Sequence, residues 1–251
     1  MDDQSEFDRI CVEEVRAQGR DPDLRAVTAE WMRLSQPHHY SYHFEWLGRP
    51  VIQHPQDIVA IQQLIWQIRP DLVIETGVAR GGSLILSASI LELVALCGGP
   101  AGARVLGIDI DIRPHNRAAI EAHPLSPRID LLQGSSTDAA IVAEVMKRAE
   151  GAGRVLVLLD SNHTHEHVLE ELRAYAPLVT VGSYCVVFDT IIAEMPDDSY
   201  PDRPWTREAN PRSAIAAFMA EPGVPQFEID SDIDARLLVT VAPGGFLRRV
   251  G

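Results

Sequence analysis

The feature that most constrains the fold of this chain is the stretch DLVIETGVARGGS, residues 71–83. Its apolar start, Leu72 to Ile74, is typical of a parallel strand that is covered on both faces. The glycines that follow permit a tight turn that a ligand can approach closely: Gly77, Gly81 and Gly82. Ser83 can cap the next helix, whose free N–H groups would face the ligand. The alternative is a tight strand-to-helix turn that binds no ligand.

Apolar strands and helices alternate along the rest of the chain. Further strands are predicted at Arg104–Asp109, Ile129–Gln133, Arg154–Asp160 and Tyr184–Asp189, with a final pair at Phe227–Asp230 and Leu237–Val241. Helices are predicted at Pro55–Ile68, Asn116–Glu121, Asp138–Glu150, Glu166–Ala174 and Pro211–Glu221. Such alternation predicts an α/β fold with a parallel sheet. In sheets of this kind ligands bind beyond the carboxyl ends of the strands.

Four of the predicted strands end in a carboxylate: Glu75, Asp109, Asp160 and Asp189. We expect these acids to converge on one rim of the sheet, although turn formation and helix capping explain one or two of them. Asp109 could accept hydrogen bonds from the ribose of a dinucleotide or of S-adenosylmethionine (SAM). The turn lacks the middle glycine of the dinucleotide motif G-x-G-x-x-G, which argues against a pyrophosphate site. Arg80 in the turn leaves an anion site open.

The densest group of titratable residues is DSNHTHEH, residues 160–167. From His163 to His167 it matches H-x-x-E-H, a zinc-peptidase motif in which Glu166 would activate water. That motif belongs inside a helix, whereas here it directly follows a strand. For His165 and His167 we favour a polar helix face. His163 lies near the rim of the predicted pocket and could act as a general base.

Two segments lie outside the regular pattern. Residues 1–54 are expected to form two helices followed by an aromatic and histidine-rich segment, residues 36–54. This segment either covers a pocket or joins a subunit interface, or it simply packs on the main domain as an extension. We predict a domain boundary there, with the main domain at residues 55–251. Residues 193–210 are acidic and rich in proline, which predicts an irregular functional loop.

Composition excludes several classes of protein. The net charge of −14 disfavours a nucleic acid partner, since such a chain repels phosphate backbones. The three cysteines are too few and too scattered for a disulfide framework, and we expect Cys97 and Cys185 to be buried. The acidic start MDDQSEF does not resemble a signal peptide, and no apolar stretch is long enough to cross a membrane. We therefore expect a cytoplasmic protein.

Three runs, DLVIETGVARGGS, GIDID and LLDSNHTHEHVLEELRAYAPLVTVGSYCVVFDT, together resemble the cephalosporin hydroxylase family. The likeness extends over about residues 40–192. That family includes SAM-dependent O-methyltransferases that act on sugars of antibiotics and glycolipids. The resemblance implies a class I SAM-dependent methyltransferase (Rossmann-like) fold, with seven mostly parallel strands and helices on both faces. The N-terminal helices would then be an extension to that fold.

The resemblance also implies roles for individual residues. It implies that SAM is bound by Glu75, Thr76, Gly77, Gly81, Ser83, Asp109, Ser135 and Asp160. It places a magnesium ion between Asp160 and Asp189, with His163 as the base. Phe188 stands where the family carries Glu, and Asn162 where many relatives carry an acid, so we expect weak magnesium binding.

The function that follows is transfer of a methyl group from SAM to a sugar hydroxyl of a natural product. The expected partner is a small glycosylated or hydroxylated acceptor, and we expect a homo-oligomer formed through the aromatic N-terminal segment. Two alternatives stay open: a component of hydroxylation or methoxylation of a cephem ring, and a non-catalytic SAM-fold subunit of a biosynthetic complex.

Overall fold

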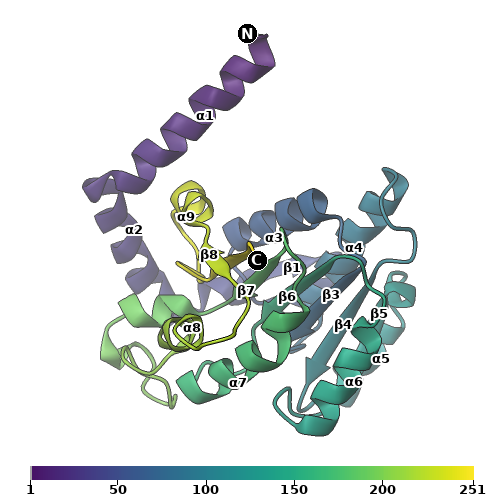
Figure 1. Cartoon of the computed structure of the whole chain (residues 1–251). Coiled ribbons are helices and arrows are strands. Elements are labelled where there is room, and N and C mark those ends of the chain that lie inside the picture. The colour runs from purple at the N-terminus through teal and green to yellow at the C-terminus, as the bar shows by residue number, and fades with distance from the viewer. Residues whose placement is uncertain (1) are drawn as a thin grey trace.

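A seven-stranded sheet forms the centre of the protein, which is described by a computed structural model that places residues 2–251 (Figure 1). The strands are β3 (Leu72–Thr76), β4 (Arg104–Asp109), β5 (Ile129–Gln133), β6 (Val155–Leu159), β7 (Tyr184–Val187), β8 (Phe227–Ile229) and β9 (Phe246–Arg249). Their order is β5-β4-β3-β6-β7-β9-β8. Strands β3 to β7 run parallel, and β9 runs antiparallel to both of its neighbours. The predicted class I methyltransferase architecture is confirmed.

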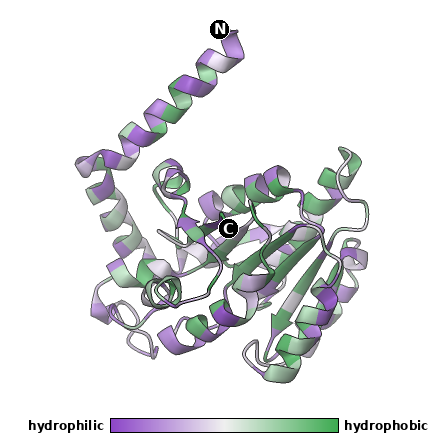
Figure 2. Ribbon diagram, in the orientation of Figure 1, coloured by the Kyte–Doolittle hydropathy of each residue, from purple (hydrophilic) through white to green (hydrophobic). Residues whose placement is uncertain are grey.

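Helices cover both faces of the sheet, because successive strand residues point to opposite sides. The helices are α3 (Pro55–Ile68), α4 (Gly82–Leu96), α5 (Pro114–Glu121), α6 (Ala139–Ala149), α7 (His165–Tyr175), α8 (Pro211–Met219) and α9 (Ser231–Leu237). Val73 packs in a core with residues of α3 and α4, whereas its neighbour Ile74 packs in a second core with residues of α7 and α8. The central strands are accordingly largely hydrophobic in Figure 2.

The N-terminal segment contains two helices, as predicted, α1 (Asp3–Arg20) and α2 (Pro22–Ser35). Helix α1 projects from the body of the molecule and buries none of its residues (Figure 1). Its end touches α9, where Arg16 pairs with Asp232 at 3.2 Å. The aromatic segment then forms the 3-10 turns η1 (Gln36–His38) and η2 (Tyr40–His43) and a hairpin of β1 (Phe44–Trp46) and β2 (Arg49–Val51).

The predicted strand at Leu237–Val241 is wrong. Asp230 caps α9 through the N–H of Ile233, and Leu238 ends that helix with a left-handed φ of 58°. The buried carboxylate of Asp57 then accepts hydrogen bonds from the hydroxyl of Thr240 and the N–H of Val241. These bonds hold the segment in an irregular conformation, so the last strand is β9.

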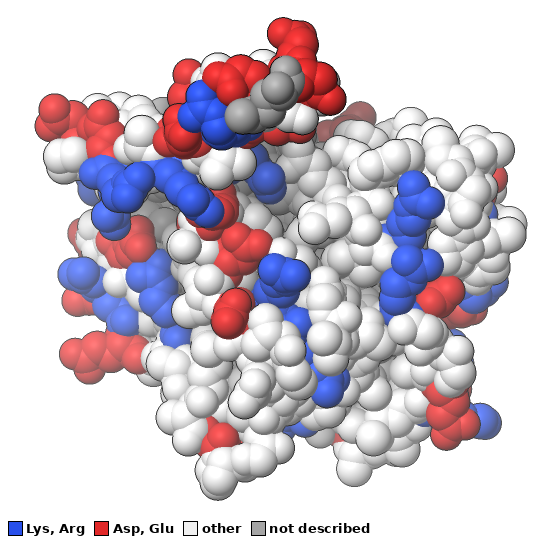
Figure 3. All heavy atoms as spheres, turned by 45° about the horizontal axis from the view of Figure 1, so that its top comes forward, with Lys and Arg blue, Asp and Glu red and all other residues white. Residues whose placement is uncertain are grey.

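The surface agrees only in part with expectation. Cys185 is buried as predicted, but Cys97 is exposed because it lies at the C-terminal cap of α4. Acidic and basic side chains are interspersed on the face shown in Figure 3, with uncharged areas between them. Within residues 2–251, no helix has the length and apolar character needed to cross a membrane.

Candidate active site

The glycine-rich turn between β3 and α4 is held by Asp109, the last residue of strand β4. Oδ2 of Asp109 accepts hydrogen bonds from the N–H groups of Val78 at 2.8 Å and Ala79 at 3.1 Å. Gly77, with a φ of 91°, approaches the backbone of Asp160 so closely that a Cβ would collide with its carbonyl oxygen. Glycine is therefore required where the turn meets β6. The carboxylate of Asp109 organises the turn and still has acceptor positions for a ligand.

Glu75 lies buried beneath this turn. The hydroxyl of Ser83 donates to its Oε1, while Oε2 has no hydrogen-bond partner among the described residues. Burial raises the pKa of Glu75 to about 7, an effect that the Ser83 hydrogen bond opposes. The expectation that Ser83 caps α4 is wrong, since Gly81 is the N-cap residue and Ser83 lies within the helix.

The remaining residues expected at the cofactor lie along the same rim. The N–H of Asp160 donates to the carbonyl of Thr76 at 3.0 Å, which joins the ends of β3 and β6. Thr76 is fully buried. Ser135 follows β5, and its hydroxyl lies 3.1 Å from that of Thr137. The structure thus brings the carboxyl ends of β3, β4, β5 and β6 to one edge, as the sequence predicts.

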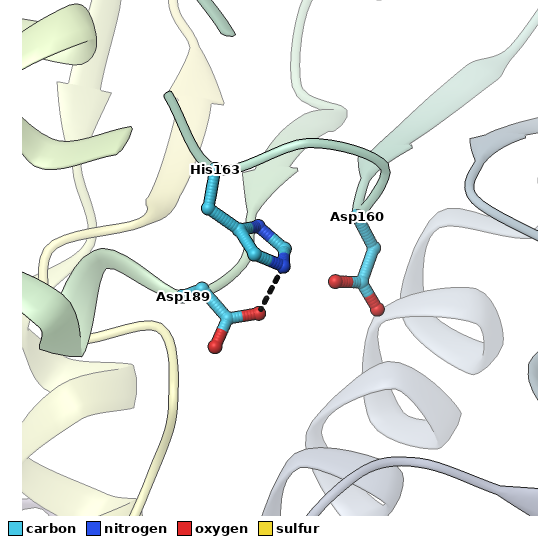
Figure 4. Close-up of side chains that lie close together, drawn as sticks. All are labelled: Asp160, His163 and Asp189. Carbon is cyan, nitrogen blue, oxygen red and sulfur yellow. Dashed lines mark ion pairs between the residues drawn. The ribbon is translucent and has the colours of Figure 1, made fainter. Parts of the chain in front are cut away.

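Asp160, His163 and Asp189 form a cluster at the ends of the neighbouring strands β6 and β7. One ligand atom from each lies within 4.8 Å of the other two. Nε2 of His163 is 3.4 Å from Oδ2 of Asp189, and the carboxylate of Asp160 faces both across a small space (Figure 4). Within residues 2–251 no other three His, Cys, Asp or Glu side chains are arranged so that they could hold a metal ion. Two of the four strand-end acids, Asp160 and Asp189, thus lie together with His163.

The electrostatics of this cluster favour a cation. Burial, and then the negative charges of Asp189 and Glu75, raise the pKa of Asp160 well above its ordinary value. A positive charge between the two aspartates would relieve this repulsion, and paired carboxylate oxygens are ligands that magnesium accepts. The donor set therefore fits such an ion.

The two departures from the family pattern do not add ligands. Phe188 is 1% exposed and packs in the core beside the sheet, so this position supplies nothing to the cluster. Oδ1 of Asn162 accepts a hydrogen bond from the N–H of Thr164 at 3.0 Å and stabilises the loop that carries His163.

The zinc-peptidase interpretation is wrong. Helix α7 begins at His165, so His163 lies outside it and the motif does not share a helix face. Nε2 of His167 lies 3.0 Å from the hydroxyl of Ser136, and Nδ1 of His165 lies 2.8 Å from that of Ser213. Both histidines therefore have structural contacts.

Three aromatic side chains that the sequence analysis did not single out lie at or near the cluster, and one of them, Trp205, contacts His163. The ring of Trp205 lies 4.9 Å from that of His163, centroid to centroid, and 6.4 Å from that of Tyr200. His54 is 6% exposed and packs between the rings of Trp31 and Tyr40; burial lowers the pKa of its imidazole, and the negative charge of Asp189 acts in the opposite direction. The only sequence signal for Trp205 was an isolated tryptophan in a proline-rich acidic loop.

The fold and this rim define a class I SAM-dependent methyltransferase. A family model described as "Rhamnosyl O-methyltransferase/CmcI" matches residues 38–250. The chain belongs to this family, which confirms the resemblance, and it is a SAM-dependent O-methyltransferase.

Similar proteins agree with this assignment. Rhamnosyl O-methyltransferase of Mycobacterium leprae is 31% identical over 206 residues, which is 81% of this chain and 82% of that protein. The Mycobacterium tuberculosis H37Rv protein of the same name is 31% identical over 196 residues, 77% of this chain and 73% of that one. An apo structure of CmcI has a TM-score of 0.54 at 22% identity, with 84% of this chain and 77% of that chain covered. A CmcI structure described as containing Mg and SAM has the same TM-score, and both show the fold.

The Asp109 geometry generates a prediction about cofactor binding. Asp109→Ala removes a carboxylate that holds the turn, so we expect SAM to bind more weakly by about 1.5–3 kcal/mol, the range for hydrogen bonds to a charged group. Isothermal calorimetry with SAM measures the change. Asp111→Ala is the matched control, because Asp111 is exposed two residues further on, and an equal loss in both variants would contradict the role of Asp109.

Proposed function

We propose that this enzyme transfers the methyl group of SAM to a hydroxyl of a sugar carried by a natural product, its acceptor being a small glycosylated molecule. The observation that carries the proposal is the Asp160–His163–Asp189 cluster, which lies at the same rim as the glycine-rich turn. The names of the relatives support a sugar acceptor of the rhamnose type.

The cofactor would lie along the ends of β3, β4 and β5. In this proposal the cofactor lies against the turn that Gly77 and Gly81 form, Asp109 accepts from its ribose, and Ser135 lies by its adenine. Thr76 and Ser83 shape the turn from within. The buried acids Glu75 and Asp160 would attract the positive charge of the sulfonium, because opposite charges interact strongly where water is excluded.

The chemical step needs alignment and a base. The acceptor oxygen forms a bond to the methyl carbon as the bond from sulfur to that carbon breaks, and His163 takes the hydroxyl proton. Asp189, 3.4 Å from Nε2 of His163, then stabilises the imidazolium. Asp160 orients the reacting groups from across the cluster.

Asp160 and Asp189 are the residues that would hold magnesium. Such an ion, when bound, supplies a positive charge that lowers the pKa of a coordinated hydroxyl. We expect weak binding, because Phe188 provides no third carboxylate and fewer anionic ligands lower the affinity.

Methyl transfer to simple glycosides tests the proposed function. We expect S-adenosylhomocysteine and a monomethylated product, detected by mass spectrometry, when the protein is incubated with SAM and 4-nitrophenyl α-L-rhamnopyranoside. If the protein binds SAM but methylates neither this glycoside nor glycosides of other hexoses and deoxyhexoses, the result would favour the non-catalytic subunit instead. Methylation of a hydroxylated cephem alone would favour the cephem alternative.

His163 and the metal can be tested together. We expect His163→Ala to lower kcat by roughly 10²–10⁴-fold, the usual contribution of a general base, with SAM affinity nearly unchanged. His115→Ala, at an exposed position on α5, should keep the full rate.

EDTA should reduce the rate of the wild-type enzyme, and millimolar magnesium should restore it. A rate that changes with neither EDTA nor magnesium would remove the metal from the proposal.

We also propose that residues 1–54 are an extension of the methyltransferase domain at 55–251 and that the chain assembles as a homo-oligomer through this extension. Helix α1 buries no residue, yet it carries apolar side chains such as Phe7, which is 61% exposed, and Val12, which is 47% exposed. Contact with a second copy would remove this apolar surface from water.

Light scattering should therefore give a mass above that of a single chain. Phe7→Glu should shift the protein toward the monomer, because a charge in an apolar interface is costly. Leu96→Glu, at a 76% exposed position at the end of α4, is the control and should leave the mass unchanged. A monomer mass at every concentration would refute the proposal.

A further inference from the structure

The irregular segment between η5 (Thr190–Glu194) and α8 brings Trp205 against the candidate base. The rings of Trp205 and His163 meet at an interplanar angle of 73°. Arg203, two residues earlier, lies with its guanidinium carbon 5.3 Å from the centre of the Trp205 ring. A tryptophan far away in the sequence thus forms one wall of the space beside His163.

Hydrogen bonds to the residues that directly follow Trp205 fix its position. The carboxamide of Asn210, a buried residue, donates to the carbonyls of Thr206 at 3.0 Å and Arg207 at 2.6 Å. Asn210 also caps α8 in a reciprocal arrangement with Ser213. The hydroxyl of Ser213 lies 2.8 Å from Nδ1 of His165, on the segment that carries His163. The indole and the base are therefore positioned by one connected network.

The other end of the same loop is tied to the N-terminal segment. The carboxamide of Gln36 donates to the carbonyl of Ser199 at 2.9 Å. Next to this contact, Tyr200 packs with Trp31 against the small core of Met32, Ile191 and Met195. Trp31 in turn lies 5.9 Å from His54, centroid to centroid. Trp205 thus contacts Tyr200, His54 contacts Trp31, and both pairs are linked through the small core against which Tyr200 and Trp31 pack.

Two polar atoms in these rings have no partner among residues 2–251. They are Nε1 of Trp205 and Nδ1 of His54, and both are shielded from solvent. Most buried polar groups are paired, and an unpaired one requires an explanation such as a missing ligand. His54 itself is 6% exposed, packed between Trp31 and Tyr40. Trp205 contacts His163, and the charge of Asp189 acts on His54, so the candidate site itself suggests what that ligand is.

We propose that Trp205 and His54 bind the sugar ring of the acceptor. This inference depends on the proposed function and names the residues that select its substrate. Nε1 of Trp205 donates to an oxygen of the sugar, Nδ1 of His54 pairs with one of its hydroxyls, and the aromatic walls contact its C–H groups. The class of ligand is a neutral deoxyhexose or hexose, because a carboxylated sugar would be repelled by Asp160 and Asp189.

Conservative and drastic variants separate recognition from packing. Trp205→Phe keeps an aromatic ring against His163 but loses the N–H donor. We expect a three- to tenfold higher KM for 4-nitrophenyl α-L-rhamnopyranoside, the effect of one lost hydrogen bond, with kcat within about twofold and an unchanged KM for SAM. Trp205→Ala also frees the imidazole and should lower kcat further. His54→Phe should raise KM for the sugar in the same way.

The control is Trp66→Phe, at a 44% exposed position on α3, which should match the wild type in every constant. A KM for the rhamnoside that does not change in Trp205→Phe and His54→Phe overturns this inference while the proposed function stands. To separate the two ideas where no turnover occurs, calorimetry measures rhamnoside binding in the presence of S-adenosylhomocysteine. Binding that weakens in Trp205→Phe supports the subsite even then, and binding that is absent or equal in both proteins refutes it.

Discussion

Negative charge gathered at one edge of the sheet is the constraint on which the rest of the site depends. Glu75, Asp160 and Asp189 end adjacent strands there, and within residues 2–251 none of them pairs with lysine or arginine. Burial raises the pKa of Glu75 to about 7, and burial and mutual repulsion raise that of Asp160. Buried carboxylates that stay ionised without a cationic partner lower the stability of a folded protein. The sulfonium of SAM, a metal ion and a protonated imidazole are three partners that the chemistry of the proposed reaction provides.

The sheet and its acidic rim could be predicted from the sequence because they follow from local patterns. Buried parallel strands are continuous apolar runs, and a helix between two strands forces their carboxyl ends to the same edge. Once the runs ending at Asp160 and Asp189 are recognised as neighbouring strands, their proximity follows without any side-chain detail. His163 follows in turn, since a residue just after a strand must lie at that rim.

Trp205 and His54 could not be found in this way, because their positions are set by contacts distant in sequence. Trp205 lies in a segment without periodicity, and only the Asn210–Ser213–His165 network places it at His163. The failed strand at Leu237–Val241 has the same origin. An apolar pattern favours a strand, but the bonds from Thr240 and Val241 to the buried carboxylate of Asp57 prevail. No local pattern reports such a bond.

The charge at the rim also bears on why Phe188 is tolerated. A third carboxylate beside Asp189 would add to the repulsion that already raises the pKa of Asp160, and a tightly bound metal ion would be needed to offset it. With a phenylalanine buried in the core instead, two acids and one imidazole remain, and in the proposed reaction His163 would neutralise part of the charge when it takes the proton of the acceptor. A phenylalanine at position 188 is thus consistent with the proposed role of His163 as the base. In that proposal the imidazole and the cofactor would neutralise more of the charge, and a bound ion less.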